Sequence, residues 1–230
     1  MIKSLSTSLA LAGISGSLVF MSQISPASAI TLIGNLPQTN DLVRSQIARV
    51  GSEVSVKALG FTLPTGSDYT LTNVILRLED YNPGEQPIVQ IRNDVGGLNP
   101  GNTVLASFIN PASQGSGIFD YTFTPTSAFT FLANTKYWLY VSNNFGDFDF
   151  RGSFPAQTMT GIATLAGNRY STNSGVSFVN SNVLNSFQIN VTEAVTPVPE
   201  PTTIAGIMVG YGFMRWKKTS GKSKKAKASA

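Results

Sequence analysis

The side chains available for catalysis set the first limit on function. The 230-residue sequence contains no histidine and no cysteine. Ser-His-Asp and Cys-His catalysis, histidine-ligated zinc or iron sites and disulfides are therefore excluded. The sequence also has no phosphate-cradling G-x-x-x-x-G-K-[ST] motif and no convincing dinucleotide fingerprint. We predict a non-enzymatic protein without a cofactor, and a polysaccharide-active enzyme that uses a carboxylate pair is an alternative.

Carboxylate and amide side chains gather in three places, and each place is a candidate site. One cluster follows an apolar run, one precedes a glycine-rich turn, and one surrounds aromatic residues. They are Glu79-Asp80 with Asn82 and Glu85, Asn93-Asp94, and Asn143-Asn144-Phe145-Gly146-Asp147-Phe148-Asp149.

Asp147 and Asp149 are the candidate metal ligands. Alternate residues of a strand share a face, so both carboxylates could reach one hard cation such as calcium. The competing interpretation is a polar loop whose Asn and Asp side chains bond to nearby backbone groups. We favour the loop, because an EF-hand-type calcium loop places more ligands in a fixed register. Calcium binding at this pair stays an alternative.

Aromatic residues offer a possible platform for a sugar. Phe145, Phe148 and Phe150 lie in a segment rich in Asn and Asp, which would suit a carbohydrate. The competing interpretation places most aromatic residues in the core or in cross-strand pairs. We favour the core for Trp138, because it lies in a strongly strand-like segment. The aromatic candidates are Tyr81, Tyr121, Trp138, Phe145, Phe148 and Phe150.

The elements that must position these residues are predicted to be strands. Apolar residues alternate with others in five runs, and a two-residue period is typical of a half-buried strand. No segment of the body shows a helical repeat, so we predict an all-β fold, a jelly-roll-like β-sandwich. The alternating residues are Val54, Val56 and Ala58; Val74, Leu76 and Leu78; Val89 and Ile91; Tyr137, Leu139 and Val141; and Phe187, Ile189 and Val191.

Turn signals separate these runs. They are Pro64-Thr65-Gly66, Asn82-Pro83-Gly84, Gly96-Gly97, Asn99-Pro100-Gly101, Asn110-Pro111 and Gly115-Ser116-Gly117.

The N-terminus is predicted to be a cleavable signal peptide. Lys3 precedes an apolar run from Leu9 to Met21, which is short for a membrane span. Ala27-Ser28-Ala29 matches the small-x-small pattern that signal peptidase cleaves, with Ala27 and Ala29 as the small residues. Cleavage is favoured over an uncleaved anchor, so the protein is predicted to be exported.

The net charge of +4 does not describe the body of the chain. Residues 30–193 hold eight basic and eleven acidic residues, a net charge of −3, whereas seven basic residues lie from position 215 onward. The basic character belongs to a tail and is no argument for nucleic-acid binding.

The C-terminus has three parts in a fixed order. Residues 196–201 hold three prolines and should form an extended linker. Residues 202–214 are apolar and uncharged, about 20 Å long as a helix. Arg215, Lys217 and Lys218 follow, and such a basic cluster stays on the cytoplasmic side of a membrane.

These three parts resemble the PEP-CTERM sorting signal of Gram-negative bacteria. Pro199, Glu200 and Pro201 match its namesake tripeptide, and Arg215, Lys217 and Lys218 match its basic stop. The resemblance implies cleavage near the motif by an exosortase, an integral-membrane cysteine protease, and an association with exopolysaccharide.

The body is similar to the choice-of-anchor R domain of surface proteins. The similarity implies location and fold more than activity. It is carried by residues 71–78 (LTNVILRL), 89–94 (VQIRND), 97–101 (GLNPG) with Leu105, and 132–139 (LANTKYWL).

Together these features predict an exported protein that is transiently anchored in the membrane and then lies at the cell surface or outside the cell. The first alternative is that the protein is a carbohydrate- or calcium-binding module of the envelope. Expected partners are signal peptidase, the exosortase, the membrane and exopolysaccharide, with no nucleic acid. The predicted divisions are a signal peptide (1–29), a β-sandwich (30–193), a linker with the PEP motif (194–201), a short transmembrane helix (202–214) and a basic cytoplasmic tail (215–230).

Overall fold

The computed structural model describes residues 29–194, and this part of the chain is built from strands and contains no helix. The prediction of an all-β fold is confirmed. The strands are β1 (Ile30–Gly34), β2 (Val43–Val50), β3 (Glu53–Val54), β4 (Val56–Thr62), β5 (Tyr69–Tyr81), β6 (Gln86–Val95), β7 (Asn99–Ile109), β8 (Gly115–Pro125), β9 (Thr130–Phe131), β10 (Lys136–Phe145), β11 (Asp147–Gly152), β12 (Thr160–Gly161), β13 (Thr164–Ser171), β14 (Val179–Asn180) and β15 (Phe187–Glu193).

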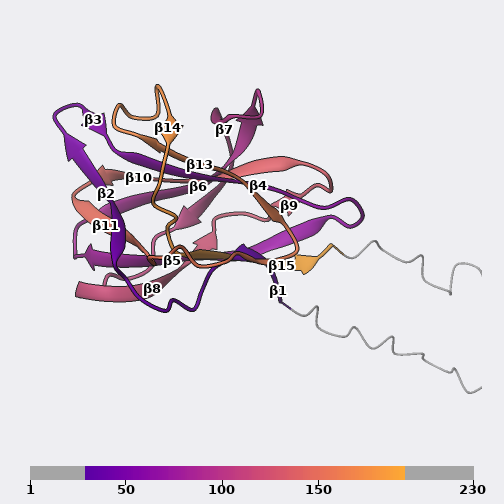
Figure 1. Ribbon diagram of the computed structural model, residues 1–230, viewed down its shortest axis with the longest axis horizontal. Helices are drawn as coiled ribbons and strands as arrows, with labels where there is room; N and C mark the ends of the chain where they lie inside the picture. Colours follow the sequence, from indigo (N-terminus) through magenta and orange to yellow (C-terminus); the bar gives the residue numbers. More distant parts are fainter. Residues whose placement is uncertain (1–28, 195–230) are drawn as a thin grey trace, which may run out of the picture.

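All fifteen strands belong to one curled antiparallel sheet. Its path runs β12-β1-β15-β5-β8-β7-β6-β10-β4-β13-β14, with β11, β2, β3 and β9 attached beside it. The sheet folds over where β8 pairs with β7. The arm that contains β15, β5 and β8 therefore faces the arm that contains β6, β10 and β4, and the two form sandwich-like layers (Figure 1).

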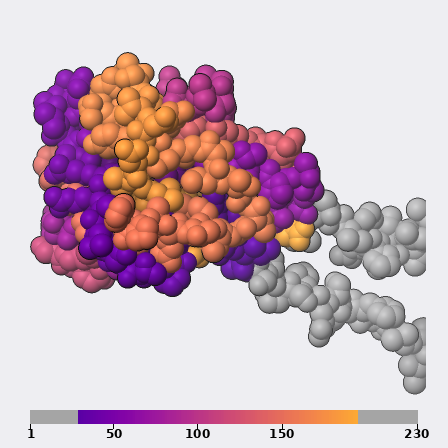
Figure 2. All heavy atoms as spheres, in the orientation of Figure 1, coloured from indigo at the N-terminus to yellow at the C-terminus, as the bar shows by residue number. Residues whose placement is uncertain are grey.

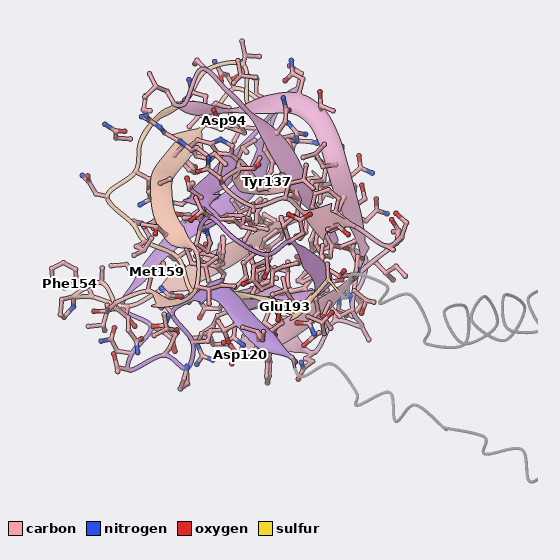
Figure 3. The ribbon with its side chains drawn as sticks, turned by 90° about the vertical axis from the view of Figure 1, so that its right-hand side faces the viewer. Asp94, Asp120, Tyr137, Phe154, Met159 and Glu193 are labelled. Carbon is pink, nitrogen blue, oxygen red and sulfur yellow. The ribbon has the colours of Figure 1, made fainter. Side chains whose placement is uncertain are left out.

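The core fills the space between the two arms. In four of the five runs the residues predicted to alternate inward do so, as Leu76 in β5, Leu139 in β10 and Ile189 in β15 are fully buried in one cluster. In β4 the prediction is wrong, because Val56 and Ala58 are buried outside that cluster. Figure 3 shows Tyr137 inside the molecule and Phe154 projecting from its surface. The two-residue period therefore identified the inward faces of β5, β6, β10 and β15 correctly.

A second buried layer covers the other face of the β10–β4–β13 arm. Trp138 of β10 is opposite Gly60 of β4, which in turn is opposite Gly167 of β13. The indole is fully buried but lies outside the main core cluster. A Cβ atom at Gly60 would lie 3.0 Å from the ring, and one at Gly167 would overlap it. The ring therefore lies across two strands that have no side chain beneath it.

Two predicted turns prove to be strand. Asn99-Pro100-Gly101 opens β7, where Pro100 is opposite Asp94 of β6, and Gly115-Ser116-Gly117 opens β8. The turn between β6 and β7 occupies residues 96–98, of which Gly96 and Gly97 have positive φ (64° and 77°). Once those two glycines reverse the chain, the next residues are free to pair.

The two ends of the described chain lie on neighbouring strands. β1 pairs antiparallel with β15, and Ile30 is opposite Val191. Residues 29–194 contain no helix long and apolar enough to cross a membrane. The predicted signal peptide and the predicted short helix at 202–214 fall outside the described residues, apart from Ala29.

Candidate functional site

A β-bulge at the end of β5 brings two adjacent carboxylates to one side of the sheet. Val74, Leu76 and Leu78 face the core, but the next buried residue is Tyr81, so the alternation shifts by one position. The pairing register with β8 is interrupted at the same place. Asp80 is the extra residue of the bulge. Its φ is 56°, a left-handed conformation that Asp tolerates better than most residues. Glu79 and Asp80 are therefore both turned away from the core.

The third carboxylate comes from β11. β15 pairs with β5 as far as Leu76, and β11 pairs with the next part of β5, at Leu78 and Glu79. Asp149 is directly opposite Glu79 in the β11–β5 pairing. One carboxylate oxygen from each of Glu79, Asp80 and Asp149 lies within 4.8 Å of the other two. We call these three residues the carboxylate cluster.

Two arginines partly neutralise this cluster. Arg44 Nη1 donates to Asp149 Oδ2 over 2.6 Å, and Arg151 Nη1 lies 3.1 Å from Glu79 Oε2. The Asp149 side chain is only 9% exposed. Its other oxygen, Oδ1, is buried and has no hydrogen-bond partner among the described residues. Buried carboxylate oxygens are normally satisfied, so this atom calls for an explanation.

Asp80 and Asp149 of the cluster line a hollow of about 450 Å³, together with two more carboxylates, those of Glu85 and Asp147. Burial raises the pKa of Glu85, hydrogen bonds from Asn82 oppose that shift, and the charges of Asp147 and Asp80 add to it. The hollow is therefore acidic, because its lining holds four carboxylates and one guanidinium group, that of Arg44.

The predicted metal ligands are only partly together. Asp149 joins the carboxylate cluster, whereas Asp147 is exposed, lines the hollow and accepts a long hydrogen bond from Gln46 (3.5 Å). The predicted clusters around Glu79 and around Asp147 meet in space. The third, at Asp94, is elsewhere: its carboxylate accepts hydrogen bonds from Trp138 Nε1 and from the backbone of Gly97.

The predicted aromatic platform does not form. Phe148 and Phe150 are buried in the core, because they alternate with the outward-facing aspartates, and only Phe145 is exposed. The favoured interpretation, burial of most candidates, holds for Tyr81, Tyr121 and Trp138. The three-phenylalanine platform is therefore wrong.

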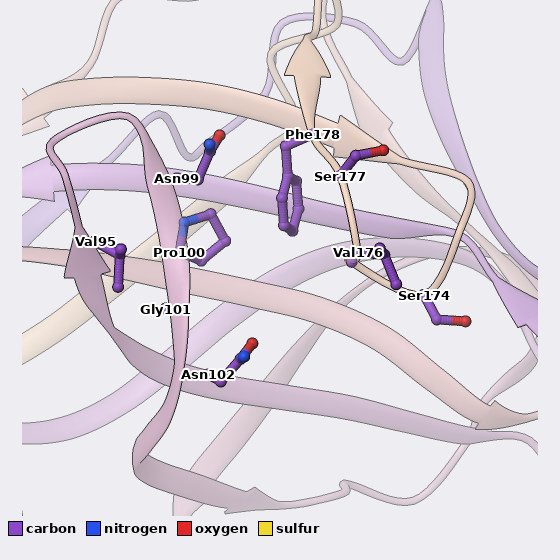
Figure 4. A pocket seen from close by; sticks show the side chains of 10 residues that line it. Val95, Asn99, Pro100, Gly101, Asn102, Ser174, Val176, Ser177 and Phe178 are labelled. Atoms are coloured by element: carbon purple, nitrogen blue, oxygen red, sulfur yellow. The ribbon is translucent and has the colours of Figure 1, made fainter.

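A separate groove of about 480 Å³ lies between the start of β7 and the loop that precedes β14. Phe178 points its ring into the space between these two segments (Figure 4). No side chain that lines the groove is ionisable. The lining residues are Val95, Asn99, Pro100, Gly101, Asn102, Ser174, Gly175, Val176, Ser177 and Phe178.

Comparison with known proteins finds no match. No family model, no curated protein and no solved structure is similar to this chain. The predicted sorting residues Pro199, Glu200 and Pro201, and the basic stop, lie outside the described residues.

Proposed function

We propose that this chain is an exported, non-enzymatic protein of the cell surface or extracellular matrix, with a jelly-roll-like body. A signal peptidase removes residues 1–29, and an exosortase-type protease recognises Pro199-Glu200-Pro201 while the apolar segment at 202–214 holds the chain in the membrane. Exopolysaccharide is the partner that the sorting signal implies.

The observation that supports this proposal is the position of the two ends of the body. β1 begins at Ile30, directly after the predicted cleavage site, and β15 ends at Glu193, directly before the predicted linker. The strands are paired neighbours, so both ends leave the same region of the sheet (Figure 1). Both processing events would then cut outside the sheet, and neither would remove a strand.

Replacing Glu200 by alanine tests the sorting step. We expect full-length protein to accumulate in the membrane fraction, because the apolar segment is intact while the recognition motif is damaged. Intact-mass spectrometry of wild type from a host with an exosortase should show a chain without the C-terminal lysines.

The matched control is Glu193→Ala, a nearby carboxylate that accepts a hydrogen bond from Ser67 within the body. This variant should be processed like wild type. Wild type that retains its C-terminal lysines in such a host would contradict the proposal.

A second candidate function is binding of a neutral glycan in the groove at Phe178. Aromatic faces stack on apolar faces of ligands, and the amides and hydroxyls of Asn99, Asn102, Ser174 and Ser177 offer donors and acceptors for sugar hydroxyls. The absence of ionisable side chains from the lining favours an uncharged ligand.

The probes for the groove are maltohexaose and cellohexaose, titrated by calorimetry. We expect Phe178→Ala to weaken binding about tenfold or more, as loss of a stacked aromatic anchor does. Phe154→Ala is the control, because Phe154 is 66% exposed and does not line the groove. Binding that Phe178→Ala leaves unchanged, or no binding of either oligosaccharide, would contradict this function.

A further inference from the structure

The carboxylate cluster combines strong repulsion with incomplete compensation. Like charges this close repel each other, and the repulsion grows as solvent is excluded. Arg44 and Arg151 each contact one carboxylate, those of Asp149 and Glu79. Asp80 forms no ion pair among the described residues, and Glu85 and Asp147 add further negative charge to the hollow. The arrangement lacks positive charge where the three carboxylates meet.

The buried oxygen of Asp149 points to the same deficit independently. Its side chain is more than nine-tenths buried, and Arg44 occupies Oδ2 alone. Oδ1 is left with no partner among residues 29–194. An ionised carboxylate oxygen that is removed from water and left unsatisfied destabilises the folded chain. A bound cation would satisfy this atom and reduce the repulsion together.

We propose that Glu79, Asp80 and Asp149 bind one calcium ion. The donors are carboxylate oxygens, with no nitrogen or sulfur ligand, which favours a hard cation over zinc or copper. Calcium accepts six to eight oxygens in irregular geometry, whereas magnesium requires near-ideal octahedral geometry. Ligands that come from a bulge and a neighbouring strand suit the more tolerant ion. Water from the hollow completes the coordination.

The site would also join two elements that are weakly paired. β11 and β5 share only two register pairs, Asp149 with Glu79 and Phe150 with Leu78. A cation held by residues of both strands cross-links this junction. Because calcium binds the folded chain and the unfolded chain cannot assemble the cluster, it should raise the melting temperature by mass action.

Calorimetric titration of the full chain with calcium chloride, after removal of metal with a chelator, tests the proposal. We expect one site per chain, with a dissociation constant in the range of extracellular calcium modules, about 0.1–1 mM. Asp149→Asn and Glu79→Gln should each weaken binding by at least about tenfold, since each removes a charged ligand. Thermal unfolding should show a calcium-dependent rise that both variants lose.

Two controls make the outcome specific. Glu53→Gln removes an exposed carboxylate on β3, outside the hollow, and should bind calcium like wild type. Asp147→Asn removes a carboxylate of the hollow that is not in the cluster, and should weaken binding less than about threefold. The thermal data compare each variant with and without calcium, so a variant that is merely less stable still reports on the site.

The proposal is overturned if wild type shows neither heat of binding nor a thermal shift at about 10 mM calcium, well above the expected dissociation constant. It is also overturned if Asp147→Asn abolishes binding while Asp149→Asn preserves it. Magnesium chloride at the same concentration should give a smaller thermal shift, and an equal or larger shift would contradict the assignment to calcium.

Discussion

Replacing Trp138 by alanine is expected to lower the free energy of unfolding by about 3–5 kcal/mol, as for other fully buried aromatic residues. The ring lies over the bare backbone at Gly60 and Gly167, so these two positions offer no side chain to fill the space. The variant also removes the hydrogen bond from Trp138 Nε1 to Asp94 (2.8 Å) and the contact of the Lys136 ammonium with the ring. Urea denaturation followed by circular dichroism measures the loss.

A matched control comes from the same strand. Phe145 of β10 is 64% exposed, and Phe145→Ala should change stability by less than about 0.5 kcal/mol, the usual range for surface substitutions. Trp138→Phe should lie between wild type and Trp138→Ala, because it keeps an aromatic ring and loses the donor. Equal stabilities for Trp138→Ala and Phe145→Ala would show that the second buried layer does not hold β10, β4 and β13 together.

Raising the pH above 7 is expected to stabilise the protein through Lys57. This residue is fully buried in β4, and its ammonium contacts Ser181 Oγ and the carbonyl of Val183, each at 2.5 Å. Burial lowers the pKa of Lys57 from 10.5 to about 7. Figure 2 shows the segment after β13, in orange, at the surface of the molecule.

The sign of the effect follows from proton binding. Between pH 7 and 10.5 the unfolded chain holds a proton on Lys57 that the folded chain has released, so stability rises by roughly 1.4 kcal/mol for each pH unit. The contribution is complete above pH 10.5 and is lost as the pH falls through 7. Burial also raises the pKa of Tyr81, Tyr121 and Tyr140, so ionisation of these residues in the unfolded chain opposes the trend near pH 10.

Two variants isolate the lysine. Lys57→Met should be more stable than wild type near neutral pH, and its advantage should shrink by about 2–3 kcal/mol between pH 7.5 and 9.5. Lys57→Arg keeps its charge throughout this range, so it should be destabilised at every pH. A difference between wild type and Lys57→Met that is constant with pH would contradict the lowered pKa.

The alternation of apolar residues predicted much of the fold, because it records which strand face is buried. It placed Leu76, Leu139 and Ile189 correctly. It failed in β4, where Leu59 and Phe61, on the same face as Lys57, belong to the main core cluster and Val56 and Ala58 do not. β4 lies between β10 and β13 and is buried on both faces, and the residues that cover Lys57 come from positions 181–183. A period within one strand carries no information about a covering segment so distant in sequence.

The candidate site was predictable in parts. The sequence identifies Glu79 with Asp80, and Asp147 with Asp149, as acidic groups. Their meeting depends on the register of β11 against β5 and on the bulge at Asp80. A bulge does not require Asp at any position, whereas a tight turn often requires glycine. The sequence therefore does not reveal that the alternation of β5 shifts at Asp80. The same alternation that suggested a shared face for the two aspartates could not show that only Asp149 is covered by the neighbouring strand.

The two strands at the ends of the sheet path are short, and this affects how copies of the protein meet when they are crowded together. β12 and β14, where the path ends, are each two residues long. Such strands expose too few unpaired amide and carbonyl groups to template the addition of a strand from another molecule. Copies packed densely side by side would meet at these edges through side chains and not through a shared backbone ladder. Addition of a strand from another copy onto β12 or β14 is therefore disfavoured.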